Sequence, residues 1–134
     1  MLTRTAGGEL HGHEYSVVTR AYADAIHVLV HKDEKVGRMF KCQLYPQPQG
    51  VPHDGLLAGV TAERLVGGSA EDISGNLYTE MIASLILKQA PDESRLLILG
   101  LGNVGPRTNE DISPTHREEL LFVIKLAQES SVWN

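Results

Sequence analysis

The sequence has a single cysteine, Cys42, which excludes an internal disulfide and a thiolate metal cluster. This cysteine usage is typical of a reducing compartment, and we expect the thiol to pack within a strand. No run approaches the roughly 18 consecutive apolar residues that a membrane helix needs. The N-terminal residues also lack the apolar core of a signal peptide and the arginines of a transit peptide. We therefore expect a soluble protein of the cytosol, with the nucleus as a second location.

Clusters of lysine and arginine are missing as well. The chain has 12 Lys and Arg against 17 Asp and Glu, so its formal net charge is −5. Because cationic side chains that neutralise phosphates supply most of the affinity for nucleic acid, we expect no nucleic-acid partner. With 134 residues, 42% of them hydrophobic, the chain is long enough to form one domain with its own core.

The first half of the sequence is typical of a β-sheet. β-Branched and aromatic residues predict strands at 13–23 and 25–31, and a hairpin connection at 31–37 leads into a strand at 38–45. We interpret these as three consecutive antiparallel strands. A loop rich in proline and glycine follows at about 45–56. A further strand is predicted at 56–68 and ends at two glycines.

The second half switches to helical spacing. Residues 74–90 have one wide apolar face, with Ser74 or Asn76 as the helix cap and Pro91 marking the end. A strand at 95–102 is apolar on both faces, which predicts a place near the middle of the sheet.

A polar loop at about 103–114 precedes the last helix, which runs to about residue 130. The helix starts either at Ser113, with Pro114 behind it, or at Thr115, with Glu118 three residues later. Together the elements predict an α+β fold in a single domain over residues 1–134. It has a mainly antiparallel sheet of five to six strands with two helices on one face. The expected order is four strands, an optional fifth, a helix, a strand and a helix.

Three glycines, Gly100, Gly102 and Gly105, spell G-x-G-x-x-G directly after an apolar strand. In a dinucleotide fingerprint the helix starts at the glycines, so that its N–H groups point at the pyrophosphate. Here the next helix starts about eight residues late, and too little chain remains for the strand that carries an acidic ribose ligand. We therefore interpret the glycines as a strand end and a loop, and we expect no cofactor. A nucleotide- or small-molecule-binding enzyme that uses the loop 100–105 remains the alternative.

The six histidines suggest a metal site. The pairs His11 with His13 and His27 with His31 each share one strand face, but neither has a third ligand at a recognisable spacing. Serines in the glycine-rich turns do not form a nucleophile motif. We therefore expect no metal, no catalytic residue and no enzymatic activity.

The last helix is apolar over more of its circumference than a lone surface helix requires. Its stripes include Leu120, Phe122 and Leu126, and Trp133 follows near the end of the sequence. A deeper core closed by the C-terminal tail and an association surface explain this pattern equally well. Near the helix start, Glu118 and Glu119 are explained by the helix dipole, which favours negative charge there.

The strand at 25–31 has two different faces. One face is suited to lie under the helices and consists of Ile26, Val28 and Val30. The other is neither clearly core nor clearly solvated and consists of Ala25, His27, Leu29 and His31. Because two helices cannot cover both faces of a sheet of this size, a half-apolar face is left over. Such faces commonly serve for association.

Three strings, together with the order of the elements, resemble the proteasome assembly chaperone 3 family. They are AYADAIHVLVHKDEKVGRMFKC, TAERLVGG, and the tail from RLLILGLGNV to REELLFVIKLAQESSVW, and they cover most of residues 14–133. The loops 45–56 and 103–114 depart from the family. The resemblance implies a small antiparallel sheet with two helices and no enzymatic activity. It also implies a dimer, with a related chain or with itself, that holds proteasome α-subunits while the α-ring assembles.

On this basis the sequence predicts two interaction surfaces. The dimer interface would lie on the leftover sheet face around His27, Leu29 and Lys41. A polar edge would meet the α-subunit, through a hairpin tip and a loop that contain Lys32, Asp33, Glu34, Arg107, Asn109 and Glu110. An interaction module of another complex remains an alternative to the proteasome role.

Overall fold

The computed structural model describes residues 2–46, 60–67, 73–105 and 113–133. The strands are β1 (Leu2–Leu10), β2 (His13–Ala21), β3 (Ala25–Lys32), β4 (Arg38–Gln43), β5 (Glu63–Val66) and β6 (Leu96–Leu101). The helices are α1 (Ile73–Gln89) and α2 (Pro114–Glu129). The order β-β-β-β-β-α-β-α confirms the α+β fold that the sequence predicts. Neither described helix is long and apolar enough to cross a membrane.

The six strands form one mixed sheet in the spatial order β1-β2-β3-β6-β4-β5. β6 is parallel to β3 and antiparallel to β4, and the other neighbouring strands are antiparallel. The three consecutive strands β2, β3 and β4 alternate in direction, as predicted, but the expected pairing of β4 with β3 is wrong because β6 lies between them. β4 follows β3 through a tight turn, with one bridge between Lys32 and Lys35, and then pairs with β6. β6 is apolar on both faces, and its central place removes both of its edges from water.

β1 is a strand that the sequence pattern does not reveal, because its glycines Gly7 and Gly8 have low strand propensity. A two-residue turn at His11 and Gly12, both with positive φ, pairs it with β2 along its whole length. A Cβ at Gly8 would lie 2.8 Å from the ring of Phe122. The glycine therefore lets α2 pack closely on this edge strand.

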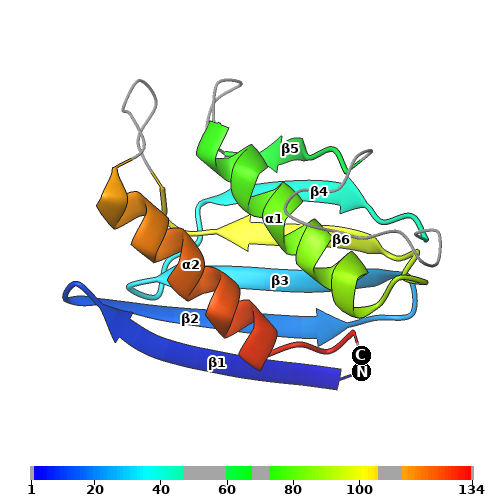
Figure 1. Cartoon of the computed structure of the whole chain (residues 1–134), viewed down its shortest axis with the longest axis horizontal. Helices are drawn as coiled ribbons and strands as arrows, with labels where there is room; N and C mark the ends of the chain where they lie inside the picture. Colours follow the sequence, from blue (N-terminus) through cyan, green and yellow to red (C-terminus); the bar gives the residue numbers. More distant parts are fainter. Residues whose placement is uncertain (1, 47–59, 68–72, 106–112, 134) are drawn as a thin grey trace.

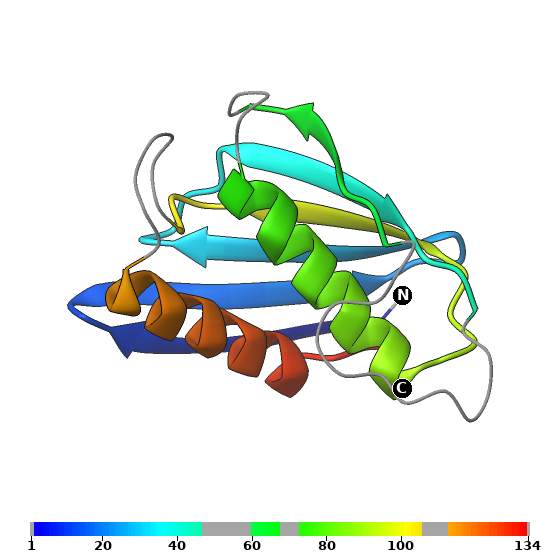
Figure 2. The same cartoon turned by 45° about the horizontal axis from the view of Figure 1, so that its top comes forward.

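Both helices cover the same face of the sheet, as Figures 1 and 2 show. α2 contacts β1 and β2, whereas α1 contacts β4, β5 and β6. The core lies between the two layers, and the predicted inner residues are fully buried there, namely Ile26, Val28 and Val30. Cys42 also packs in this core, as predicted, with 1% of its surface exposed. Burial raises the pKa of its thiol.

α2 begins at Ser113, which is one of the two predicted starts. The Ser113 hydroxyl accepts a hydrogen bond from the backbone N–H of His116 at 3.2 Å, and Pro114 is the first helical residue. The imidazole Nδ1 of His116 accepts the backbone N–H of Ser113 at 3.1 Å and completes the capping box. In this capping box the third helical residue is His116. The other start predicted from the sequence would have paired Thr115 with Glu118 in the same way.

α1 begins at Ile73, so Ser74 and Asn76 lie inside the helix and the predicted caps are wrong. Ser74 is buried, and a Cβ at Gly105 would lie 2.7 Å from its Cβ. Ser74 therefore packs against Gly105 in the β6–α2 connection. α1 ends at Gln89, close to the predicted stop at Pro91. Residues 47–56 of the predicted loop 45–56 and 106–112 of the predicted loop 103–114 lie outside the described residues, as do residues 56–59 and 68 of the predicted strand 56–68.

The C-terminal tail closes the core beside α2. Val132 and Trp133 are 7% and 6% exposed, and the indole Nε1 of Trp133 donates a hydrogen bond to Gln89 Oε1 at 2.7 Å. Arg4 donates to the carbonyl of Ser131 at 3.0 Å. A deeper core therefore accounts for the apolar tail, while Leu121 of α2 is left 66% exposed.

Candidate functional site

No described helix covers the second face of the sheet (Figure 1). Strand register places one largely apolar row across this open face, from β2 to β5, made of Val18, Leu29, Gly100, Met39 and Val66. The next row mixes charged and apolar groups and is made of Arg20, His27, Ile98, Lys41 and Glu63. An apolar strip bordered by polar groups is typical of a protein association surface.

The three residues that the sequence predicts for the dimer interface all lie on this open face. His27 and Leu29 belong to β3, and all three are half-buried. Lys41 belongs to β4, so Ile98 of β6 lies between it and His27. Sequence reasoning missed Ile98 because it placed β4 directly beside β3. The Tyr22 ring packs on His27 with ring centroids 4.6 Å apart.

Gly100 has a packing role at the centre of the open face. A Cβ there would lie 2.9 Å from Leu29 Cδ2 and 3.0 Å from Val36 Cγ1. The side chains of Leu29 and Val36 therefore lie over the glycine and keep the apolar row continuous. This contact explains the first glycine of the G-x-G-x-x-G motif without a ligand.

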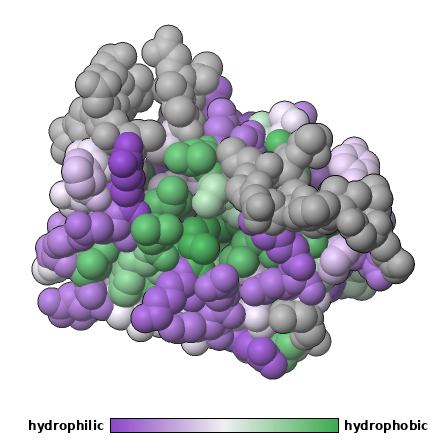
Figure 3. Space-filling model, viewed as in Figure 1, coloured by the Kyte–Doolittle hydropathy of each residue, from purple (hydrophilic) through white to green (hydrophobic). Residues whose placement is uncertain are grey.

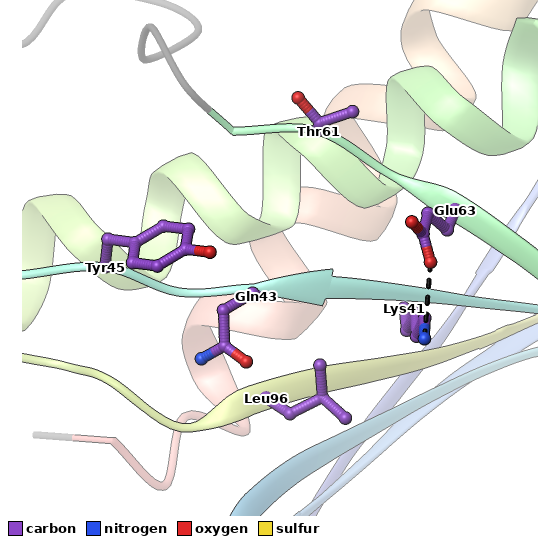
Figure 4. A pocket seen from close by; sticks show the side chains of 6 residues that line it. All are labelled: Lys41, Gln43, Tyr45, Thr61, Glu63 and Leu96. Atoms are coloured by element: carbon purple, nitrogen blue, oxygen red, sulfur yellow. Dashed lines mark ion pairs between the residues drawn. The ribbon is translucent and has the colours of Figure 1, made fainter.

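A hollow of about 350 Å³ lies at the β4–β5 side of the open face (Figure 4) and is lined by Lys41, Gln43, Tyr45, Thr61, Glu63 and Leu96. Lys41 Nζ and Glu63 Oε2 form an ion pair across it at 3.3 Å. The side chains of Lys41 and Glu63 are 41% and 65% exposed, so solvent screens the pair and it contributes little to folding. A partner surface can therefore replace the pair without loss of the fold.

Three connections meet at one end of the sheet and form a second surface, which we call the loop end. His11 in the β1–β2 turn bonds to Glu118 of α2 at 2.8 Å. His13 bonds to Asp33 of the β3–β4 turn at 2.7 Å. The third connection is the start of the segment between β6 and α2, where the Gly105 N–H points into the interior.

Glu119 is the buried centre of the loop end. Its carboxylate accepts hydrogen bonds from Tyr15 Oη at 2.5 Å, Lys32 Nζ at 2.9 Å and the Gly105 N–H at 2.6 Å. Burial alone would raise the pKa of Glu119, but these three donors hold it below the ordinary value. Burial, with the hydrogen bond to Glu119, raises the pKa of Tyr15. One carboxylate thus joins two strands, a loop and a helix.

Sequence reasoning assigned Glu119 to the helix dipole and missed this cluster. Glu119 lies in the second turn of α2, where the dipole effect is already weak. A signal was present, because a spacing of four and seven residues places Glu119 on the same helix face as Val123 and Leu126. A carboxylate on the core-facing side of a helix requires buried partners.

The predicted partner-binding residues have different surroundings. Lys32 is 17% exposed and its ammonium points inward to Glu119, 5.7 Å from the centre of the Tyr15 ring. The hydrogen bond from His13, together with the Glu14 N–H, lowers the pKa of Asp33. Glu34 is exposed at the turn and has a positive φ of 66°. The other predicted contacts, Arg107, Asn109 and Glu110, lie outside the described residues.

A polar cavity of about 270 Å³ opens at the loop end and is lined by His11, His13, Tyr15, Lys32, Asn103, Gly105, Thr115, His116 and Glu119. Each of its three histidines already bonds to a neighbouring side chain. Within the described part of the chain, no group of three or more His, Cys, Asp or Glu residues is placed to hold a metal ion.

The backbone groups of Gly102 and Gly105, the two later glycines of the motif, form hydrogen bonds within the protein. Gly105 donates its N–H to Glu119, so a carboxylate of the protein itself takes the donor that a phosphate would need. Arg38 donates to the carbonyls of Gly102 and Val104 at 2.7 and 3.0 Å. The next described helix starts only at Pro114. This geometry differs from a dinucleotide-binding turn, in which the helix N-terminus directly follows the glycines.

We expect Gly102→Ala to lower the free energy of unfolding by about 1–3 kcal/mol, because the added methyl overpacks the β3–β4 turn. Its Cβ would lie 2.5 Å from the Lys35 carbonyl oxygen and 2.9 Å from the Lys32 nitrogen, so backbone must move. Urea unfolding measures the change. Gly37→Ala in the same connection is the control, because nothing lies within 4 Å of a Cβ there and Gly37 has no positive φ. A Gly102→Ala protein as stable as the wild type would contradict the packing role.

No protein-family model matches the chain, and no curated protein matches its sequence. The chain is similar in structure to one in the crystal structure of a novel chaperone complex for yeast 20S proteasome assembly. The TM-score is 0.66 at 13% sequence identity, and the match covers 96% of this chain and 98% of the yeast chain. The two chains share a fold over almost all of the residues compared.

Proposed function

We propose that the chain is a non-enzymatic chaperone for assembly of the proteasome core particle. It acts as a dimer and holds α-subunits while the α-ring forms, in the cytosol and secondarily in the nucleus. The observation that carries this proposal is the end-to-end fold match to a protein of a proteasome assembly chaperone complex. The three sequence strings that resemble the proteasome assembly chaperone 3 family are consistent with it.

The open sheet face is the proposed dimer interface. Its apolar row gains stability when a second chain covers it, because half-buried side chains such as Leu29 and Met39 are then removed from water. The neighbouring mixed row contains the charged residues Arg20, Lys41 and Glu63, and these select the partner through charge complementarity. The partner is a related small chain or a second copy of this one.

The loop end is the proposed contact for the α-subunit. Glu119 of α2 bonds to Lys32 at the end of β3, and two further contacts link the turns to their surroundings, His11 with Glu118 and His13 with Asp33. Exposed polar groups such as Glu34 then lie on a rigid support. A rigid support lowers the entropy cost of binding.

A pull-down of the tagged chain from cells, with mass spectrometry of the bound proteins, tests the function. We expect proteasome α-subunits and one small partner chain, with little of the mature β-ring. Recovery of a different complex, or of no complex, would show that the fold alone is shared.

Two charge reversals test the two surfaces in the same assay. Lys41→Glu places two carboxylates side by side at Glu63, and we expect it to abolish the small-chain contact or self-association while the fold is kept. Glu34→Lys should remove the α-subunits and keep the small chain. Arg64→Glu is the control for Lys41→Glu, because Arg64 is an exposed cation on the opposite face of β5 from Glu63. A pull-down that neither reversal changes would remove both surfaces from the proposal.

A further inference from the structure

The helix face carries an apolar patch that the described fold leaves open. α1 and α2 run side by side in both ribbon views, and Figure 3 shows apolar side chains gathered near the centre of this face. We call the following six residues the interhelical patch: Leu77, Met81, Leu85, Leu120, Leu121 and Ile124. Five of them are half-buried and Leu121 is 66% exposed.

Helical spacing places the residues of each half of the patch on one stripe of their helix, and the two helices contact each other. Leu77, Met81 and Leu85 recur every four residues on α1, and Leu120 and Ile124 do the same on α2. The helices are fixed relative to each other at both ends. Gly105, which bonds to Glu119 of α2, packs against Ser74 at the start of α1, and Gln89 bonds to Trp133 at the other end.

The core does not require the most exposed part of this patch. Val123, Leu126 and Ala127 already fill the sheet-facing side of α2. A single exposed leucine is common on protein surfaces. Leu121, however, adjoins a set of half-buried apolar side chains, and contiguous apolar patches of this kind mark interaction sites.

The rim of the patch is basic, although the chain as a whole has a net charge of −5. Arg117 and Lys125 lie one helical turn before and after Leu121, on the same stripe, and Lys88 follows Leu85 on α1. Lys125 has only a weak, exposed contact of 4.0 Å with Glu129. Arg117 and Lys88 are exposed cations.

The nearby acidic side chains are engaged elsewhere. Glu118 of α2 bonds to His11 at 2.8 Å, and Glu80 of α1 accepts the backbone N–H of Ala62 at 3.3 Å. The cations around the patch therefore have no strong acidic partner among the described residues. This charge distribution is complementary to an apolar surface with acidic flanks.

We propose that the interhelical patch binds an amphipathic helix of a protein partner, with apolar residues at spacings of three and four and acidic residues on both flanks. Such a helix lays its apolar face over α1 and α2, and its carboxylates meet Arg117, Lys125 and Lys88. The proposal is independent of the proteasome role, because it uses neither the open sheet face nor the loop end.

Two labelled helical peptides of about 18 residues test the proposal by fluorescence anisotropy with the full chain. Both have the same leucine stripe, with glutamate on the flanks of one and lysine on the flanks of the other. We expect the glutamate peptide to bind at least about tenfold more tightly than the lysine peptide, and the difference to shrink at high salt. Absence of binding, or equal binding of both peptides, would overturn the proposal.

Variants identify the site. Leu121→Glu should weaken binding of the glutamate peptide by about tenfold or more, since it removes an exposed apolar anchor and adds a like charge. Arg117→Glu with Lys125→Glu should reverse the preference between the two peptides. Leu2→Glu is the matched control, because Leu2 is a 46% exposed leucine on β1. Thermal unfolding of each variant should be unchanged, and full binding by the Leu121→Glu protein would contradict the assignment.

Two further measurements on the same variants test whether the patch binds a membrane or a second copy of the chain. Binding to vesicles with phosphatidylserine that Leu121→Glu abolishes, without peptide binding, would assign the patch to a membrane surface and overturn the proposal. Self-association that Leu121→Glu abolishes, again without peptide binding, would assign it to a second copy of the chain.

Discussion

Replacing Glu119 with alanine is expected to lower the free energy of unfolding by about 3–5 kcal/mol. The reason is that the half-buried ammonium of Lys32 then loses its ion-pair partner, the Glu119 carboxylate. The same change leaves the Tyr15 hydroxyl and the Gly105 N–H without their acceptor. Urea unfolding followed by circular dichroism measures the loss. Glu119→Gln keeps an acceptor and the side-chain shape, so we expect a smaller loss of about 1.5–3 kcal/mol.

Glu118→Ala is the matched control on the same helix. Glu118 is 59% exposed and its only described bond is to the exposed His11, so we expect a change within about 1 kcal/mol. Equal losses at residues 118 and 119 would show that Glu119 acts through the helix dipole alone. That outcome would support the interpretation made from the sequence, in which the helix dipole explains Glu119.

The Glu119 contribution should also depend on pH. The folded-state pKa of Glu119 is lower than the ordinary value of 4.5, so the unfolded chain takes up this proton first as the pH falls. The stabilisation is therefore present at neutral pH and is lost as the pH falls below 4.5 and through the folded-state pKa. The difference in unfolding free energy between the wild type and Glu119→Gln should shrink over that range. The pKa values of Asp33 and Glu93 are also lowered, so both residues make the stability depend on pH. Their effects are the same in the wild type and the variant and therefore cancel in the difference.

Trp133→Ala is expected to cost about 3–5 kcal/mol, because it removes a large buried side chain from the end of the core. The tail residues beside it then lose their support, including Ser131, whose carbonyl accepts a hydrogen bond from Arg4. Thermal and urea unfolding measure the loss.

Gln89→Ala separates packing from hydrogen bonding at this site. It removes the acceptor of the Trp133 indole and keeps the ring, so we expect a loss of about 1 kcal/mol. The sequence permits a second explanation of Trp133, as part of an association surface. A Trp133→Ala protein with unchanged stability and impaired self-association would support that explanation over the core position.

Except for β1, local patterns in the sequence determined the kind of each described element, and for β3 they also determined the face that it buries. The alternation of Ile26, Val28 and Val30 with His27 and Leu29 predicts which side of β3 lies under the helices, and the burial of these residues confirms it. Ser113 followed by Pro114 likewise predicts one end of α2. Such signals depend only on backbone geometry over one or two turns or pleats, so they can be read without knowledge of distant residues.

Only the tertiary structure decided which strands are neighbours and where polar groups are buried. The insertion of β6 between β3 and β4 places Ile98 between His27 and Lys41. The fold also brings Glu119 to Tyr15 and Lys32, residues that lie 104 and 87 positions away along the chain. Strand order and the partners of a buried charge arise from contacts between distant segments. Periodicity encodes only which face of each segment is apolar, so these features become visible once the segments have packed together.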